Sequence, residues 1–417
     1  MPIFNPEMET MKRKELLELQ TERLQIVVNQ AYSNVNFYRK RFDEAGLNPD
    51  DIKTLEDLRR IPFTTRKDLM DNYPYGMFAV PLRDVVCLQF PLGMYGNSIV
   101  IGYTREDLKI WRELVARTMV GVGITEHDII QVAFNYGLFQ GAIRFNQSAE
   151  LIGAAVVPTS IASAEVQVRI MQDFRSTVLT SAPSFALHIM ETMKRKGMDP
   201  KALSLKIGLF GAEPWPEGVR KLIEENLSIQ AYEIFGVTEL IEPGVAGECL
   251  AKNGLHIFED HFFPEVIDPV TGEVLSEGQE GELVLTTLTA CAYPLLRYRT
   301  SDVTSLCTEP CSCGRTMARM GKVLKRTDKM ISVRGINVFP EKIEEVLASI
   351  KGIGPGYSII VTEKQGMNDQ LKIRVEVSSE IPEEREEKKA VLQGVVQHAF
   401  RRALGLGVEV ELVKREK

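Results

Sequence analysis

The sequence predicts an α/β protein with a large N-terminal domain of mostly parallel sheets flanked by helices, an antiparallel β subdomain, and a small ferredoxin-like α+β domain at its end. Three observations carry this prediction. The 417 residues exceed what one hydrophobic core usually organises, so we expect two or more domains. Apolar strand-like runs alternate with helical runs through the middle of the chain, as in sheets covered by helices. The pattern then changes twice, past Gly254 and past Arg326.

The N-terminal segment has the spacing of amphipathic helices. Apolar residues such as Leu16, Leu24 and Val27 recur near helical spacing among Lys, Arg and Glu. In chain order, this segment predicts helices over residues 8–45 and 51–60, a helix start capped by Thr64 or Thr65, and a buried strand over residues 85–90.

Strands and helices alternate through the next part of the chain. The predicted strands cover residues 99–101, 129–134, 154–158, 177–180 and 206–210. The predicted helices start at Thr104 and cover residues 141–152, 164–174, 185–196 and 216–227. Because parallel strands need crossover connections, this alternation predicts a mostly parallel sheet. The later segments 262–268 and 281–288, joined by glycine-rich turns, predict antiparallel strands instead.

The last part of the chain predicts a separate small unit. Its expected order is strand 330–333, helix 340–349, strands 357–363 and 370–377, helix 388–404 and strand 408–413. This β-α-β-β-α-β order is typical of a ferredoxin-like domain. The basic linker 325–329 is the natural boundary, so we expect domains at residues 1–327 and 328–417.

Bulk composition excludes several classes of protein. The net charge of −7 argues against a general nucleic-acid or anionic-membrane surface. No run approaches about 18 uninterrupted apolar residues, and residues 1–20 lack the apolar core of a signal peptide. Six cysteines in a chain this long do not make a disulfide scaffold, so we expect reduced thiols and a cytoplasmic location.

Two short segments carry candidate metal ligands. Cys311 and Cys313 form a Cys-x-Cys turn ahead of a glycine, and Cys249 and His256 lie upstream with six residues between them. Three thiolates and one imidazole suit a closed, structural Zn²⁺ site. Cys307 is the competing ligand, and the alternative reading is a set of unrelated reduced thiols.

Three further runs carry the residue types that a nucleotide needs. They are Phe210-Gly211-Ala212-Glu213-Pro214, Ile234-Phe235-Gly236-Val237-Thr238-Glu239 and Tyr298-Arg299-Thr300-Ser301-Asp302. Small residues in the first run let the backbone approach a flat adenine, and the proline fixes the turn. The carboxylates of the other two runs are hard oxygen ligands for Mg²⁺ and strong acceptors for ribose hydroxyls.

With further motifs, these runs resemble the phenylacetate–coenzyme A ligase branch of the adenylate-forming enzymes, from about Tyr32 to the end of the chain. The further motifs are Gly102-Tyr103-Thr104-Arg105-x-Asp107, Asn135-Tyr136-Gly137-Leu138-Phe139, Asn253-Gly254-Leu255-His256-Ile257, Pro294-Leu295-x-Arg297 and Arg334-Gly335-x-Asn337-Val338-Phe339-Pro340. The resemblance implies that a carboxylate attacks the α-phosphate of ATP, pyrophosphate leaves, and the CoA thiol then displaces AMP from the acyl adenylate.

The resemblance also implies roles for individual residues. ATP or AMP would be bound by Gly211, Ala212, Glu213, Pro214, Phe235, Gly236, Asp302 and Arg326. Thr238 and Glu239 would be catalytic, with Mg²⁺ on Glu239, and Tyr136, Gly137 and Phe139 would form an aryl-acid pocket. The small domain would pivot about a hinge at Asp328. Each motif has a plainer alternative: a strand-to-helix turn, a capping Thr-Glu pair, a solvated linker charge, or aromatic core packing.

Two segments depart from the family pattern. The family loop reads Ser-Ser-Gly-Thr-Thr-Gly-Lys-Pro, whereas residues 91–98 here read Pro-Leu-Gly-Met-Tyr-Gly-Asn-Ser and lack the lysine and most hydroxyls that hold phosphates. The family's adenylation lysine lies in a Gly-Lys segment, and the surroundings of Lys414 and Lys417 do not match it. Losing one group that acts in the transition state costs about two to four orders of magnitude in rate, so we expect slow adenylation.

The sequence therefore supports three functions. The first is a ligase that joins an aryl-acetate-like acid to CoA with ATP. The second is a ligase-derived protein that binds a nucleotide or acyl-CoA without activating an acid, and the third is an acyl transferase that starts from a preformed adenylate or thioester. Nucleic acid and membrane are not expected partners, and a homodimer is one oligomeric state that the sequence allows.

Overall fold

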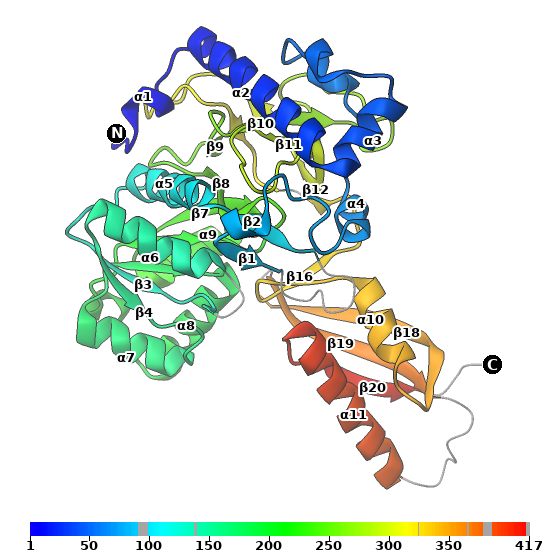
Figure 1. Cartoon of the computed structure of the whole chain (residues 1–417). Coiled ribbons are helices and arrows are strands. Elements are labelled where there is room, and N and C mark those ends of the chain that lie inside the picture. Colours follow the sequence, from blue (N-terminus) through cyan, green and yellow to red (C-terminus); the bar gives the residue numbers. More distant parts are fainter. Residues whose placement is uncertain (91–98, 137–139, 324, 365–366, 378–385, 414–417) are drawn as a thin grey trace.

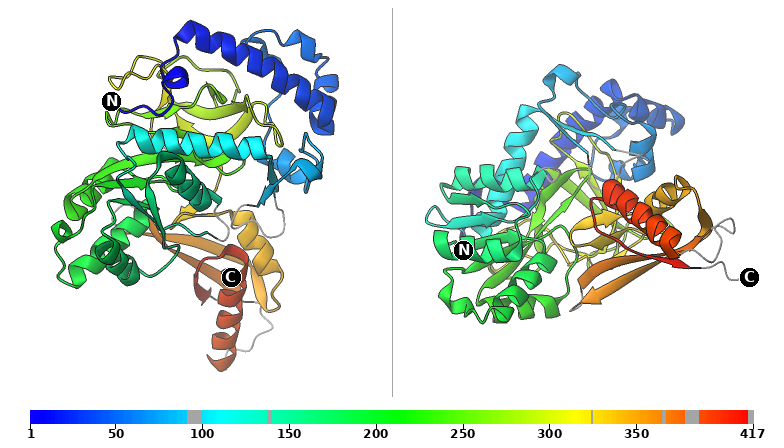
Figure 2. Two further views of the ribbon diagram at one scale, coloured as in Figure 1. Left: turned by 60° about the vertical axis from the view of Figure 1, so that its left-hand side comes forward. Right: turned by 90° about the horizontal axis from the view of Figure 1, so that it is seen from below.

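The computed structural model describes residues 1–90, 99–136, 140–323, 325–364, 367–377 and 386–413. The chain forms a large lobe and a small C-terminal lobe that projects from one side of it (Figure 1). The turned views in Figure 2 show the same two lobes. Among the described residues, no helix is both long and apolar enough to cross a bilayer.

Helices α1 (Pro6–Glu9), α2 (Arg13–Asn34) and α3 (Asn36–Glu44) open the chain. The predicted helical stretch 8–45 is interrupted twice, at residues 10–12 and at Val35, whose extended backbone separates α2 from α3. The predicted helix at 51–60 is wrong: only 3₁₀ turns form there, because the Asp57 carboxylate accepts backbone N–H groups of Lys53 and Thr54 and so competes with helical bonding.

Helix α4 (Arg66–Asp71) starts after Thr65, which forms a capping box with Asp68. Of the two caps that the sequence allowed, Thr65 is therefore the one used. The hydroxyl of Thr64 instead donates to the Leu296 carbonyl at 2.7 Å and ties this segment to the β subdomain.

A nine-stranded mixed sheet forms the centre of the large lobe. Its order is β13 (Leu306–Cys307), β14 (Arg319–Met320), β9 (Leu255–Ile257), β8 (Ile241–Gly247), β7 (Gln230–Val237), β6 (Ile207–Phe210), β5 (Val178–Ser181), β3 (Ile129–Val132) and β4 (Ala155–Pro158). The strands from β4 to β7 run parallel, as predicted. Antiparallel pairing begins at β8, earlier in the chain than the sequence indicated.

Helices pack against this sheet in two groups with separate cores. Helices α5 (Arg105–Gly121) and α6 (Gln140–Ile152) contribute Trp111 and Phe145 to the main core. Helices α7 (Ala164–Phe174), α8 (Pro183–Arg195) and α9 (Glu217–Leu227) form the second core. The predicted class, sheets flanked by helices, is confirmed.

Two smaller sheets complete the large lobe. Strands β10 (Phe262–Ile267), β11 (Gly281–Thr287), β12 (Tyr298–Thr304) and β15 (Lys325–Arg326) form the predicted antiparallel subdomain. Strands β1 (Cys87–Gln89) and β2 (Ile101–Tyr103) form a hairpin-like pair. Because β12 pairs with β15, Asp302 lies directly opposite Arg326.

The small lobe is an α+β unit, as predicted, but one strand departs from the ferredoxin-like arrangement. Its sheet has the order β18 (Ile353–Lys364), β19 (Met367–Val377) and β20 (Glu409–Val413), with α10 (Pro340–Ala348) and α11 (Glu386–Leu404). The first predicted strand, β16 (Ile331–Val333), pairs instead with β17 (Ile336–Val338). Arg334 and Gly335 both have positive φ, so they form a tight two-residue turn that folds β16 back onto β17.

Candidate active site

A cavity that is open to solvent lies where β6 and β7 end and the small lobe begins. Carboxyl ends of neighbouring parallel strands commonly form ligand sites, since the chain leaves both strands at one edge. The cavity brings the three predicted nucleotide runs together, although they come from two different sheets. Its lining includes Gly211–Pro214, Glu233–Glu239, Glu242, Thr300–Asp302, Arg326 and Asp328.

The turn after β6 brings backbone close to other elements. Ala212 has a φ of 70°, which L-residues adopt only when the surroundings hold them there. A side chain at Gly211 would place its Cβ 2.5 Å from the Ile234 carbonyl oxygen, so glycine is required where β6 passes β7. The Glu213 carboxylate is buried and accepts backbone N–H groups of Ser184 at 2.7 Å and Gly335 at 2.8 Å.

Thr238 and Glu239 follow the end of β7 directly. The Thr238 hydroxyl donates to the Glu242 carboxylate. An oxygen of Glu239 lies 3.5 Å from the Arg66 guanidinium, which itself stacks over the Phe339 ring at 3.8 Å. Glu239 is nearly buried, so its carboxylate faces the cavity and its ion-pair partner rather than bulk solvent.

Asp302 and Arg326 form a partly buried ion pair across the β12–β15 ladder. Arg326 also donates to both Asp328 oxygens, at 2.9 and 2.8 Å, and to the Thr300 carbonyl at 3.0 Å. Burial raises the pKa of Asp302 to about 6, with Arg326 opposing the rise. The segment where we expect the hinge is thus held by an ion pair in this structure.

Two acidic residues of the cavity were missed by the sequence analysis. Glu233 lies within β7, and its Oε2 has no hydrogen-bond partner among the described residues; burial and the nearby Glu248 raise its pKa to about 8. Burial raises the pKa of Glu242 to about 7. A lone acid between Tyr232 and Ile234, both buried in the same strand, is the signal that would have indicated Glu233.

The predicted aryl-acid pocket is only partly described. Tyr136 is half-buried, and its hydroxyl donates to Asn146 at 2.6 Å, but it is not among the residues that line the cavity. Gly137, Phe139, the loop 91–98 and residues 414–417 lie outside the described residues. Our expectations for them stay predictions.

Comparisons with known proteins agree with this geometry. The profile of the AMP-binding enzyme C-terminal domain matches residues 335–417. A phenylacetate–coenzyme A ligase of Thermus thermophilus is 46% identical over 90% of this chain and 84% of its own length. One of Aromatoleum evansii is 42% identical over 99% of this chain and 94% of its own. The chain belongs to the phenylacetate–coenzyme A ligase family.

A solved ligase shows which lobe arrangement this family member resembles. The 2-hydroxyisobutyryl-CoA ligase, complexed with its acyl adenylate and CoA in the thioester-forming state, superposes with a TM-score of 0.93 at 27% identity, over 99% of this chain and 89% of that one. Postadenylation and open structures of the same ligase give TM-scores of 0.72 to 0.74. The lobes of this phenylacetate–coenzyme A ligase family member are therefore arranged as in the thioester-forming complex.

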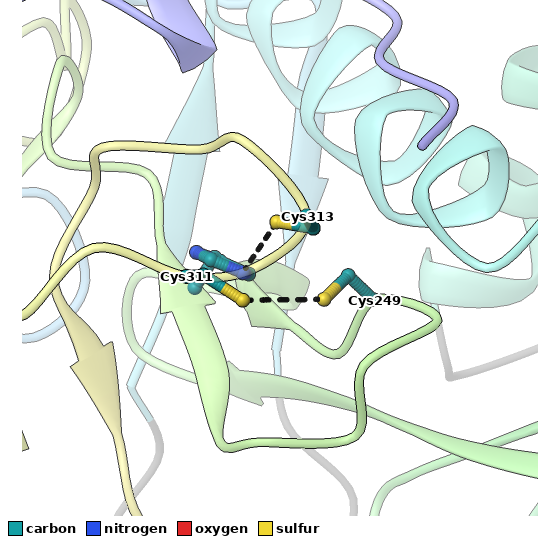
Figure 3. Close-up of side chains that lie close together, drawn as sticks. Cys249, Cys311 and Cys313 are labelled. Atoms are coloured by element: carbon teal, nitrogen blue, oxygen red, sulfur yellow. Dashed lines mark hydrogen bonds between the residues drawn. The ribbon is translucent and has the colours of Figure 1, made fainter.

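A second cluster, the cysteine cluster, lies outside the cavity and contains Cys249, His256, Cys311 and Cys313. All four are buried, and their ligand atoms lie within 4.8 Å of one another. The sulfur atoms of Cys249 and Cys311 are 3.9 Å apart, and Cys313 Sγ is 3.4 Å from His256 Nε2 (Figure 3). Cys307, the competing ligand, is not in the cluster; its sulfur accepts from Arg319 at 3.4 Å instead.

The cysteine cluster is joined to the N-terminus through Arg315. The backbone N–H of Arg315 donates to Cys313 Sγ at 3.4 Å, and its guanidinium pairs with the fully buried Glu9 at 2.5 Å. Glu9 also accepts the backbone N–H groups of Phe4 and Asn5 at 3.0 and 2.8 Å. The first residues of the chain are thus tied to the loop that carries two of the four side chains.

The raised pKa of Glu233 predicts a pH-dependent stability. Because its pKa rises from 4.5 to about 8 on folding, the folded chain binds more protons between these values, and this carboxyl lowers the free energy of unfolding as pH rises. Each unit of pKa difference corresponds to about 1.4 kcal/mol. We expect Glu233→Gln to stabilise the protein relative to wild type more at pH 8 than at pH 5, measured by denaturant unfolding.

The exposed Glu280→Gln serves as the matched control, since it removes a carboxyl of the same type from the surface. Its stability difference from wild type should be small at both pH values. A Glu233→Gln difference that does not change between pH 5 and pH 8 would contradict the predicted protonation.

Proposed function

We propose that this chain activates an aryl carboxylic acid with ATP to an acyl adenylate and transfers the acyl group to CoA. The observation that carries the proposal is the convergence of the three nucleotide runs on one cavity. The relatives named above are phenylacetate–coenzyme A ligases, and the structure with the TM-score of 0.93 holds an acyl adenylate and CoA. An aryl acid of the phenylacetate type is accordingly the substrate class that we propose.

The geometry supports a specific assignment of nucleotide contacts. The tight turn at Gly211 and Ala212 offers backbone to the face of adenine. A protonated Glu233 carboxyl, buried at the cavity wall and with no hydrogen bond to its Oε2 among the described residues, would offer a donor and an acceptor to the polar edge of the base. Asp302 would accept the ribose hydroxyls, with Arg326 holding its carboxylate in place.

Glu239 and Thr238 are the residues that would meet the phosphates. A carboxylate and a hydroxyl are hard oxygen donors, which fits Mg²⁺ bound together with phosphate oxygens. Such an ion supplies charge neutralisation for the departing pyrophosphate. In this structure Glu239 faces Arg66, so the arginine holds the carboxylate in position at the cavity wall.

Asp302→Ala should weaken AMP binding by about 1.5–3 kcal/mol, because it removes a charged acceptor and leaves Arg326 without this partner. Isothermal titration with AMP measures the change. Glu280→Gln, an exposed carboxyl, should bind AMP as wild type does. Wild-type protein that binds no AMP at millimolar concentration would contradict the proposed nucleotide site.

The sequence of the loop 91–98 favours a second function, an acyl transferase or binding protein with weak adenylation. We expect acid-dependent pyrophosphate release to be very slow, and transfer from a supplied acyl adenylate to CoA to be better preserved. The combined changes Met94→Thr, Tyr95→Thr and Asn97→Lys, which restore the family residues, should raise pyrophosphate release. Wild-type release on the order of 1–10 per second would contradict the expected defect.

We propose that the cysteine cluster binds one structural zinc ion. Zn–S distances near 2.3 Å and Zn–N distances near 2.0 Å put tetrahedral ligands about 3.5–3.8 Å apart, close to the separations of 3.9 and 3.4 Å described above. The Cys249 thiol and the His256 ring lower the pKa of Cys313, whereas the same contact with Cys313 raises the pKa of Cys249, so without a metal the cluster favours a thiolate at Cys313 and not at Cys249. The buried, closed position fits a structural role.

Purified protein should contain one zinc ion per chain by metal analysis. Cys311→Ser should lose it and unfold at a lower temperature, because a thiolate ligand is missing. Cys307→Ser is the matched control and should keep the zinc, since Cys307 lies outside the cluster. Zinc-free wild-type protein, or a Cys311→Ser variant that keeps full zinc, would refute the assignment.

A cytoplasmic location and the homodimer stay predictions from the sequence, as do the hinge at Asp328 and the boundary between residues 327 and 328.

A further inference from the structure

The two lobes meet at the side chain of Glu213. Both of its carboxylate oxygens are occupied: Oε1 accepts the Ser184 N–H of the large lobe, and Oε2 accepts the Gly335 N–H of the small lobe. The side chain is 7% exposed, so water replaces these donors poorly. When the carboxylate is ionised both bonds are charge-assisted, which makes them roughly twice as strong as bonds between neutral groups.

The turn that supplies the Gly335 N–H fits closely against the large lobe. Gly335 has a φ of 73°, which suits glycine, and a Cβ at this position would lie 3.5 Å from the Cβ of Ala182. A second contact joins the lobes nearby, where the Arg66 guanidinium stacks on Phe339. These contacts exist only while the turn of the small lobe rests on the start of α8.

Glu213 does not point its acceptors at a nucleotide in this arrangement, because backbone donors hold both oxygens. The arrangement itself is the one found in the thioester-forming complex of the related ligase. If the small lobe moved away, Oε2 would lose the only hydrogen-bond partner that the described residues provide for it. The carboxylate therefore favours the docked position of the lobe.

We propose that Glu213 is a positioning residue that latches the small lobe in the thioester-forming arrangement by accepting the Gly335 N–H. This inference rests on the proposed function. In the step that it serves, the CoA sulfur bonds to the acyl carbon, the bond from that carbon to the AMP oxygen breaks, AMP leaves with the electron pair, and the thiol proton passes to solvent. Glu213 takes no part in these bonds and acts only through the lobe.

Glu213→Gln tests the latch with little change in shape. An amide presents one acceptor and one donor, so one of the two backbone N–H groups then faces another donor. Two single-turnover rates are measured: thioester formation from supplied acyl adenylate, and acyl-adenylate formation from acid and ATP. We expect the ratio of the first rate to the second to fall about tenfold or more. A merely structural role would lower both rates together and leave the ratio unchanged, which would overturn the proposal.

A disulfide replaces the latch covalently. Ala182→Cys with Gly335→Cys places two sulfur-bearing Cβ atoms about 3.5 Å apart, within the range that a disulfide spans. We expect this crosslink to form more slowly in the Glu213→Gln background than with Glu213 present, and its formation to restore the thioester rate until a reductant is added. Single-cysteine variants given the same oxidant are the controls. Equal crosslinking rates with and without Glu213 would overturn the latch.

The same assays separate this inference from the proposed function. Wild-type protein that forms no thioester from any supplied aryl acyl adenylate contradicts the proposed function. Crosslinking rates still report on the latch in that case, because they need no substrate. Thioester formation in wild type with an unchanged ratio in Glu213→Gln contradicts the latch alone.

Discussion

The shared edge of β6 and β7 is the constraint on which the site depends. The two strands are parallel neighbours, so the chain leaves both at the same end of the sheet. The glycine turn at Gly211 follows one strand, and Thr238 with Glu239 follows the other. The third run enters from a different sheet, where pairing of β12 with β15 sets Asp302 opposite Arg326. The cavity is therefore made where two sheets meet.

Carboxylates crowd this cavity, and that crowding has a cost in the protein without ligands. Glu233 and Asp302 are buried and Glu242 is half-buried, and all three have raised pKa values, with desolvation as the main cause in each. Arg326 pairs with Asp302, whereas Glu233 has only a longer contact of 4.0 Å with Arg220. Because burying these carboxyl groups is unfavourable, binding of a cation or of a hydrogen-bonding base at this site should raise the free energy of unfolding of the protein.

A second set of contacts, outside the cavity, stabilises the large lobe. The cysteine cluster joins the turn after β8, the strand β9 and the loop before β14, and Arg315 extends this connection to Glu9 near the start of the chain. The buried Arg315–Glu9 pair would be costly to break, because either partner alone would leave an uncompensated buried charge. The cysteine cluster and the cavity are thus separate, and the residues that stabilise this part of the large lobe are different from those that line the cavity.

Much of the fold and part of the site follow from local pattern. The capping box at Thr65 and the strands from β3 to β6 each depend on residues within a few positions of one another, which is why the sequence indicates them. The motif order likewise identifies the family. At residues 51–60 the helical pattern was misleading, because the Asp57 carboxylate accepts a backbone N–H group that a helix would otherwise use.

Only the tertiary structure decided which distant residues meet. The bond from Gly335 to Glu213 joins positions 122 residues apart, and the pairing of Arg326 with Asp302 depends on strand register. The burial of Glu233 and the separation of Cys307 from the cysteine cluster are also results of packing. No periodicity encodes such contacts, because their free energy comes from burial and desolvation, which exist only once the sheets and lobes have assembled.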